Sequence, residues 1–93
     1  MIKSFRHRGL QRYFETGDHR ELRADQAKRI RRVLAILDAA ASIDTLHAMP
    51  GMRLHRLKGD LSEYWSLSVT GNWRIIFRIE NGDMYDVEFV DYH

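Results

Sequence analysis

The 93-residue sequence predicts an α+β fold in which N-terminal helices pack on a mainly antiparallel sheet of about four to five strands. Before residue 50, apolar residues recur at steps of three and four, a spacing typical of amphipathic helices. After residue 51 they alternate with polar residues, which is typical of strands that bury one face. An apolar helix stripe needs an apolar surface. We therefore expect the helices to cover one sheet face and to leave the other face open to water.

The helical half begins with a short alternating segment at residues 1–5, which we expect to form an edge strand. Residues 9–16 follow as a short helix that Gly17 ends. The strongest helical pattern covers residues 23–41, and residues 42–47 add a further turn. The apolar stripe of the long helix comprises Ala27, Ile30, Val33, Leu34, Leu37 and Ala41.

The strand-forming half contains four alternating segments, at residues 52–57, 64–69, 73–79 and 84–91. The turn Asn81-Gly82 is the best hairpin signal, because both of its residues tolerate positive φ. In the last segment we expect the apolar face to consist of Tyr85, Val87 and Phe89.

Length and composition indicate one globular domain over residues 1–93. The sequence has no cysteine, which excludes a disulfide framework, a thiolate zinc site and a cysteine nucleophile, and fits a cytoplasmic protein. No apolar run approaches the ~18 residues that a membrane span needs, so we expect no membrane partner. The basic residues of the first eight positions are not followed by an apolar segment, and we expect no secretion signal.

Charge is distributed unevenly along the chain. Residues 1–58 hold 13 Lys and Arg against 6 Asp and Glu, whereas residues 59–93 hold 2 against 7. A strongly basic segment favours a polyanionic partner such as nucleic acid, although surface charges also segregate by chance in short chains.

Two arginines, Arg74 and Arg78, should share the open face of their strand. A guanidinium binds phosphate in a bidentate manner, so both are candidate phosphate ligands. The alternative is that they form cross-strand ion pairs with Asp86 or Glu88, and this alternative is stronger for Arg78, which lies nearer the turn.

Two histidines, His55 and His93, have the chemistry that RNA cleavage without a metal ion requires. One imidazole can remove the proton of a 2′-hydroxyl while the other protonates the leaving oxygen, and Lys58 could stabilise the charge on the phosphate. The alternative is that each histidine is an ordinary surface residue. A metal site built from His55, Asp91 and His93 lacks any ligand motif, so we expect neither metal nor cofactor. Tyr64 and Tyr92 are candidate exposed aromatics that could stack on a base.

Four segments together resemble a known family. They are the opening M-I-K-S-F, the segment R-L-x-x-L-K-G-D at residues 53–60, N-W-R-I-x-F at residues 72–77 and D-Y-H at residues 91–93. The combination resembles the HigB toxins of the RelE superfamily nearly from end to end. The resemblance implies a RelE-like fold, with N-terminal helices on a curved sheet.

The resemblance also implies a function and a set of partners. HigB toxins belong to bacterial type II toxin–antitoxin systems, enter the ribosomal A site and cut the mRNA there. This implies contacts with the 70S ribosome, its 16S rRNA and mRNA. The implied antitoxin is a HigA-type helix-turn-helix protein that silences the toxin and through which alone the complex contacts operator DNA.

The family pattern assigns roles to six residues of this sequence. Catalytic roles fall on His55, Asp91, Tyr92 and His93. Roles in binding phosphate or RNA fall on Lys58 and Arg74. Two alternatives stay open, a ParE-like toxin that acts on DNA gyrase without being a nuclease, and an inert basic module that only binds RNA.

Overall fold

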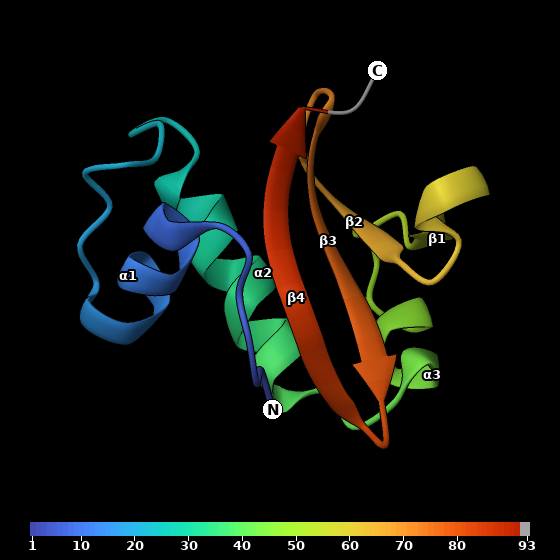
Figure 1. The fold of residues 1–93 in the computed structure, drawn as a ribbon. Helices are drawn as coiled ribbons and strands as arrows, with labels where there is room; N and C mark the ends of the chain where they lie inside the picture. Colours follow the sequence, from blue (N-terminus) through green and yellow to red (C-terminus); the bar gives the residue numbers. More distant parts are fainter. Residues whose placement is uncertain (92–93) are drawn as a thin grey trace.

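The computed structural model describes residues 1–91, and its sheet has the strand order β1-β2-β3-β4, with every neighbouring pair antiparallel (Figure 1). The strands are β1 (His55–Arg56), β2 (Trp65–Thr70), β3 (Trp73–Glu80) and β4 (Asp83–Asp91). The helices are α1 (Arg8–Thr16), α2 (Ala27–Ala39), α3 (Ile43–His47) and the 3₁₀-helix η1 (Gly59–Leu61). The predicted α+β fold is therefore confirmed.

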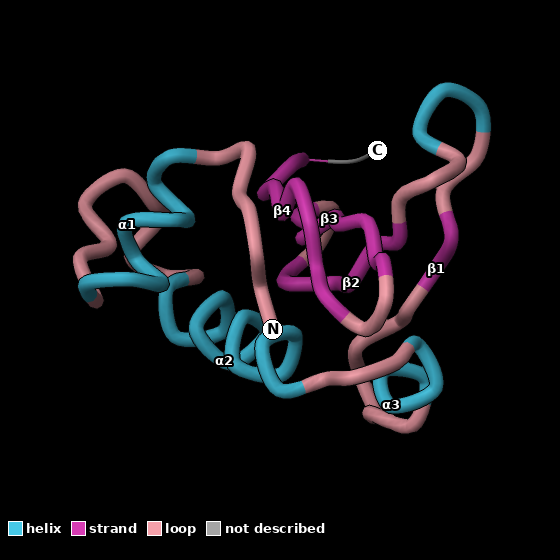
Figure 2. The backbone as a smooth tube through the Cα atoms, turned by 60° about the horizontal axis from the view of Figure 1, so that its bottom comes forward, coloured by secondary structure: helices cyan, strands magenta, loops and turns pink. Residues whose placement is uncertain are grey.

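The helices α2 and α3 lie on the same side of the strands (Figure 2). The 3₁₀-helix η1 projects away from these two helices. The main core lies between these layers. From α2 it takes Ile30, Val33, Leu34 and Leu37, and from the strands it takes residues that include Leu67, Ile75, Phe77 and Val87. The alternation predicted for residues 64–69 and 73–79 is therefore confirmed, because the members of the core share one strand parity.

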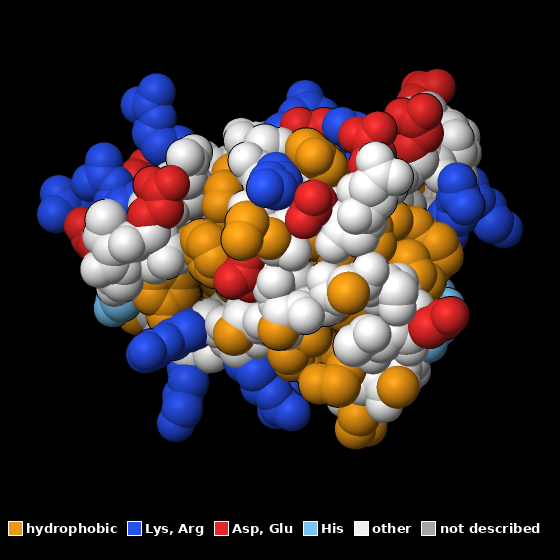
Figure 3. Space-filling model, turned by 90° about the horizontal axis from the view of Figure 1, so that it is seen from below, with side chains coloured by type: hydrophobic (Ala, Val, Ile, Leu, Met, Phe, Trp, Pro, Cys, Tyr) orange, Lys and Arg blue, Asp and Glu red, His pale blue; other side chains and the backbone are white. Residues whose placement is uncertain are grey.

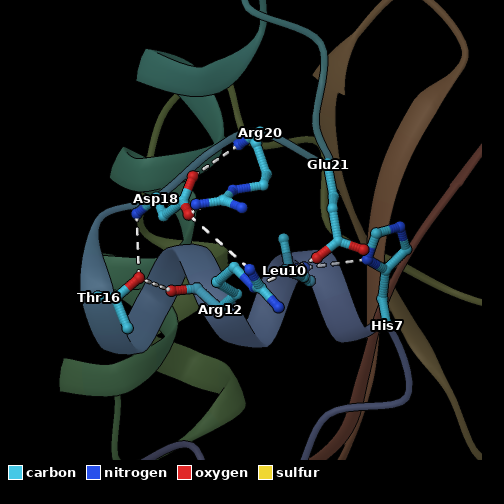
Figure 4. Close-up of polar contacts among 7 residues, drawn as sticks. All are labelled: His7, Leu10, Arg12, Thr16, Asp18, Arg20 and Glu21. Carbon is cyan, nitrogen blue, oxygen red and sulfur yellow. Dashed lines mark hydrogen bonds and ion pairs between the residues drawn. The ribbon is translucent and has the colours of Figure 1, made fainter.

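The N-terminal segment runs alongside β4, where Ile2 and Phe5 form isolated parallel bridges with Met84 and Val87. The predicted edge position is confirmed, but the segment makes single bridges and not a continuous strand. Helix α1 follows. The Nδ1 atom of His7 accepts a hydrogen bond of 3.0 Å from the backbone N–H of Leu10 at its first turn (Figure 4).

The C-terminal end of α1 is followed by a loop held by Asp18. Gly17 takes a φ of 81° and ends the helix, as predicted. The Asp18 carboxylate accepts hydrogen bonds from the backbone N–H of Arg20 at 3.0 Å and from its Nε at 2.7 Å (Figure 4). The backbone hydrogen bond from Arg20 is the main cause that lowers the pKa of Asp18.

Two predicted elements are shorter in the structure. Helix α2 begins at Ala27 and not at residue 23, because the preceding residues form turns in which the N–H of Gln26 donates to the carbonyl of Arg23. Strand β1 covers two residues and not six. Arg53, just before it, has a φ of 50°, in the left-handed region, and this conformation interrupts a strand.

The predicted apolar face of β4 is wrong in one respect. Met84 is buried with Val87 and Phe89, whereas Tyr85 is half-buried on the other face. The β3–β4 register shifts by one residue between Ile76 and Arg78, and Asp86 has a φ of 54° at this point. A β-bulge of this kind reverses the faces of all residues on one side of it.

The face of the sheet away from α2 is only partly open. Leu57, Tyr64 and Ile76 form a second buried cluster there, with Val90 packed against it. Tyr64 is 8% exposed, and its hydroxyl accepts a hydrogen bond of 3.2 Å from Arg6. The expectation that Tyr64 is an exposed stacking residue is therefore wrong. Its hydroxyl is also the main cause that raises the pKa of Arg6.

Basic side chains project from the margin of the molecule in the view from below, with apolar side chains between them (Figure 3). The four basic residues of α2 are all exposed. They are Lys28, Arg29, Arg31 and Arg32. These four positive charges of α2 are thus accessible to solvent.

Candidate active site

A pocket of about 240 Å³ on the partly open sheet face brings together three of the predicted site residues. Its wall consists of His55, Arg56, Leu57, Lys58, Ser66 and Arg74. Three of these side chains are Lys or Arg and a fourth is His, and none of the described residues in the wall is acidic. Such a wall favours an anion.

The strand register explains why residues distant in sequence meet here. His55 on β1 stands opposite Ser66 on β2, and Ser68 on β2 stands opposite Arg74 on β3. Residues that stand opposite each other in an antiparallel pair project to the same face. Lys58 follows β1 in extended conformation, directly before η1, and completes the pocket.

Arg74 is held from one side. Its Nη1 donates a hydrogen bond of 2.9 Å to Oγ of Ser68, while its Nε is buried without a hydrogen-bond partner among residues 1–91. On the β4 side its register partner is Val90, an apolar residue. No carboxylate of residues 1–91 forms a salt bridge with Arg74.

Arg78, four residues along the same strand, is in a different situation. Its Nε donates to Asp86 at 2.9 Å, its Nη1 lies 3.4 Å from Glu80, and its guanidinium lies 5.8 Å from the ring centre of Tyr85. The hydrogen bond to Asp86 is the main cause that raises the pKa of Arg78. The ion-pair interpretation of Arg78 is confirmed, and Asp86 is the partner.

Arg56 is also anchored, although it lines the pocket. Its Nε donates to the carbonyl of Ser62 at 2.9 Å, and its guanidinium lies 5.5 Å from the ring centre of Trp65. His55, Arg56 and Lys58 are all exposed. The pocket wall therefore presents two exposed side chains of predicted function, His55 and Lys58, beside an anchored arginine.

Asp91 is the last residue of β4 and is exposed. It stands opposite Trp73 in the register, next to the pair of Arg74 and Val90. Because side chains alternate along a strand, Asp91 and Arg74 project to opposite faces of the sheet. Among residues 1–91, the pocket wall does not include Asp91. Tyr92 and His93 lie outside the described residues.

Two hydroxyl residues of the site were not predicted. Ser66 lines the pocket and is 2% exposed, and Ser68 holds Arg74. The signal was present in the sequence, since both serines alternate with the apolar residues of β2 and therefore face away from the main core. Within residues 1–91, no three His, Asp or Glu side chains come together in a way that could hold a metal ion.

Comparison with known proteins decides the family. A family model described as the RelE-like toxin of the type II toxin–antitoxin system HigB matches residues 3–93. The chain belongs to the HigB-like toxins. Endoribonuclease HigB of Proteus vulgaris is 44% identical over 93 residues and the alignment covers 100% of both chains. Toxin HigB-1 of Vibrio cholerae serotype O1 is 31% identical over 83 residues, 88% of this chain and 87% of the relative.

Membership in the family confirms the resemblance based on the four sequence segments. Since HigB-like toxins are the toxin components of type II toxin–antitoxin systems, this HigB-like toxin has a cognate antitoxin. No helix within residues 1–91 is long and apolar enough to cross a membrane.

Proposed function

We propose that this HigB-like toxin is an endoribonuclease that cuts mRNA in the ribosomal A site. The observation that carries the proposal is the pocket, in which Arg74, which has no salt bridge among residues 1–91, lies in one wall with His55 and Lys58. A cation binds the scissile phosphate, and an imidazole transfers protons near neutral pH. The name of the Proteus relative supports the same activity.

The proposed reaction needs no metal ion. A base removes the proton from the 2′-hydroxyl, the 2′-oxygen attacks the adjacent phosphorus, and an acid protonates the leaving 5′-oxygen. The products are a 5′-hydroxyl and a 2′,3′-cyclic phosphate or, after hydrolysis, a 3′-phosphate. We assign the acid and base roles jointly to His55 and His93.

The remaining predicted residues have supporting roles in this scheme. Arg74 and Lys58 hold the phosphate and stabilise the charge that builds on it. Asp91 orients a neighbouring imidazole, and Tyr92 stacks on or orients the substrate.

The proposed setting is the 70S ribosome in the cytoplasm. A pocket of about 240 Å³ is too small to enclose a flexible message, so the A site would supply the fixed geometry of the substrate. A subset of the exposed basic residues of the first 58 positions would contact 16S rRNA. A HigA-type helix-turn-helix antitoxin would silence the toxin and carry the complex to operator DNA.

Primer extension on messages from induced cells tests this proposal. We expect cuts in phase with codons on a translated message, and none when its start codon is removed. The variants His55→Ala and His93→Ala should reduce cutting by at least about 100-fold. His19→Ala is the matched control, because His19 is an exposed histidine near α1, remote from the pocket, and should cut like the wild type.

Three results would contradict the proposal. Intact messages combined with inhibited DNA supercoiling would indicate a ParE-like gyrase toxin. Full toxicity of both histidine variants would indicate an inert RNA-binding module. Rapid cutting of purified, ribosome-free RNA would exclude the dependence on the ribosome.

A further inference from the structure

A second groove of about 310 Å³ lies at the β2–β3 turn, next to the candidate active site. Two arginines line it, Arg29 from α2 and Arg53 from the segment before β1, together with Ser68 and Thr70 of β2. No acidic residue of the described chain belongs to its wall, and neither arginine has a salt bridge among residues 1–91. Within the part of the chain that the structure describes, the groove therefore holds two positive charges without a salt-bridge partner.

The position of Arg29 is fixed by the packing of α2 on the sheet. Nε2 of Gln26, a residue only 3% exposed, donates a hydrogen bond of 2.8 Å to Oγ1 of Thr70. Arg29 lies three residues later, on the same side of the helix as Gln26. The contact between Gln26 and Thr70 thus directs Arg29 toward the end of β2, where it lines the groove.

The position of Arg53 depends on an unfavourable backbone conformation. Met52 is buried in the main core, 6% exposed, and Arg53 next to it is exposed with a φ of 50°. The other non-glycine residues with positive φ are Asn81 and Asp86, types that tolerate it better than arginine. Residues held in such conformations gather at binding and active sites.

The groove and the candidate active site are continuous through one residue. Ser68 lines the groove, and its Oγ accepts the hydrogen bond from Arg74 in the wall of the active-site pocket. Arg53 and His55 are two residues apart along the outer edge of the sheet, and an extended chain spans at most about 7 Å over two residues. One RNA strand is long enough to contact both sites.

We propose that Arg29 and Arg53 form a second phosphate-binding site, which takes a phosphodiester of an RNA strand beside the scissile bond. The guanidinium groups would bind the phosphate oxygens, and the hydroxyl of Thr70 is a further polar group in the wall. The proposal rests on the proposed function, since it assumes that RNA occupies the neighbouring pocket. The phosphate belongs either to the message or to ribosomal RNA.

Binding measurements on the full-length chain test the site and distinguish the two sources. The first probe is a short single-stranded 2′-O-methyl RNA, which cannot undergo attack by a 2′-hydroxyl. The second is the small ribosomal subunit without message. The variants are Arg29→Gln and Arg53→Asn, because asparagine removes the charge and tolerates positive φ. Arg31→Gln is the matched control, since it removes an exposed arginine of the same helix outside the groove.

Each groove variant should weaken binding about tenfold. The slope of log affinity against log salt should become less negative by about 0.7. Weaker binding to the oligonucleotide assigns the phosphate to the message, and weaker binding only to the ribosomal subunit assigns it to ribosomal RNA. Either result supports the site. Arg31→Gln should leave both affinities unchanged, and melting curves should show that all three variants are folded.

Unchanged binding of both groove variants to both probes would overturn the proposal. An equal loss in Arg31→Gln would also overturn it, because diffuse charge would then explain the binding. A loss of antitoxin binding without any loss of RNA binding would assign the groove to a protein. If the groove variants lose RNA binding while the wild type leaves translated messages intact, the site stands and the nuclease function fails. If the wild type cuts messages and the groove variants bind RNA normally, the nuclease function stands and the second phosphate site fails.

Discussion

The two ends of the partly open sheet face carry the same residue type in opposite situations. Arg74 and Arg78 project to the same face of β3, four residues apart. Opposite Arg74 stand Ser68 and Val90, whereas Arg78 contacts Asp86 and Tyr85. The buried cluster around Ile76 lies between them. The neighbouring strands thus decide whether an arginine of β3 is engaged by a carboxylate, as Arg78 is, or faces hydroxyl and apolar side chains, as Arg74 does.

The largest expected effect is the difference in cutting rate between the variants that remove Arg74 and Arg78. Arg74→Gln should lower the rate of mRNA cutting by about 100-fold or more, because the charge on the phosphate loses its partner. Arg78→Gln should change the rate less than about twofold, since its guanidinium is already engaged by Asp86. Primer extension on a translated message measures both rates. Equal losses in the two variants would break the comparison.

An intermediate effect is expected from an acid placed opposite Arg74. Ser68→Asp would give Arg74 a carboxylate partner, as Asp86 is for Arg78. Cutting should therefore fall about tenfold. Ser68→Thr keeps a hydroxyl and should retain most of the activity. If Ser68→Asp cuts as fast as the wild type with an unchanged melting temperature, a free charge on Arg74 is not required.

The smallest effect on cutting is expected from a change at Asp86, the partner of Arg78. Asp86→Asn should leave cutting unchanged and lower the melting temperature slightly, because asparagine tolerates the positive φ and still accepts a hydrogen bond from Arg78. The raised pKa of Arg78 means that its contribution to stability is present at neutral pH and is lost only as the pH rises through that raised value. The difference in melting temperature should therefore persist from about pH 7 to about pH 9. A clear loss of cutting would place Asp86 in the active site.

Several features of the fold followed from local pattern. The α2 stripe around Leu34, the alternation of β3 around Ile75 and the turn at Asn81 were predicted from sequence and are confirmed, because each depends on the period of its own segment. The predicted bounds of α2 and β1 were wrong. The observed bounds depend on the turn before Gln26 and on the backbone of Arg53, and the apolar period indicates neither.

Six residues of the candidate site were predicted from the sequence, and the structure brings three of them together in one pocket. His55, Lys58 and Arg74 line one pocket because the β1–β2 and β2–β3 registers bring their segments together. The catalytic roles of Asp91, Tyr92 and His93 remain predictions. Ser68 was overlooked, because its importance depends on standing opposite Arg74 in the register, and a single strand does not reveal its partner.

By itself the sequence determined the fold class, the family, the order of the elements and the candidate site residues. Local periodicity and family segments encode these properties directly. Only the tertiary structure decided that Arg78 pairs with Asp86 whereas Arg74 has no salt bridge among residues 1–91. It also decided that Tyr64 is buried and that Tyr85 leaves the core face. The physical reason is the strand register. A bulge of one residue at Asp86 reverses faces and selects partners, and register is a property of two strands together.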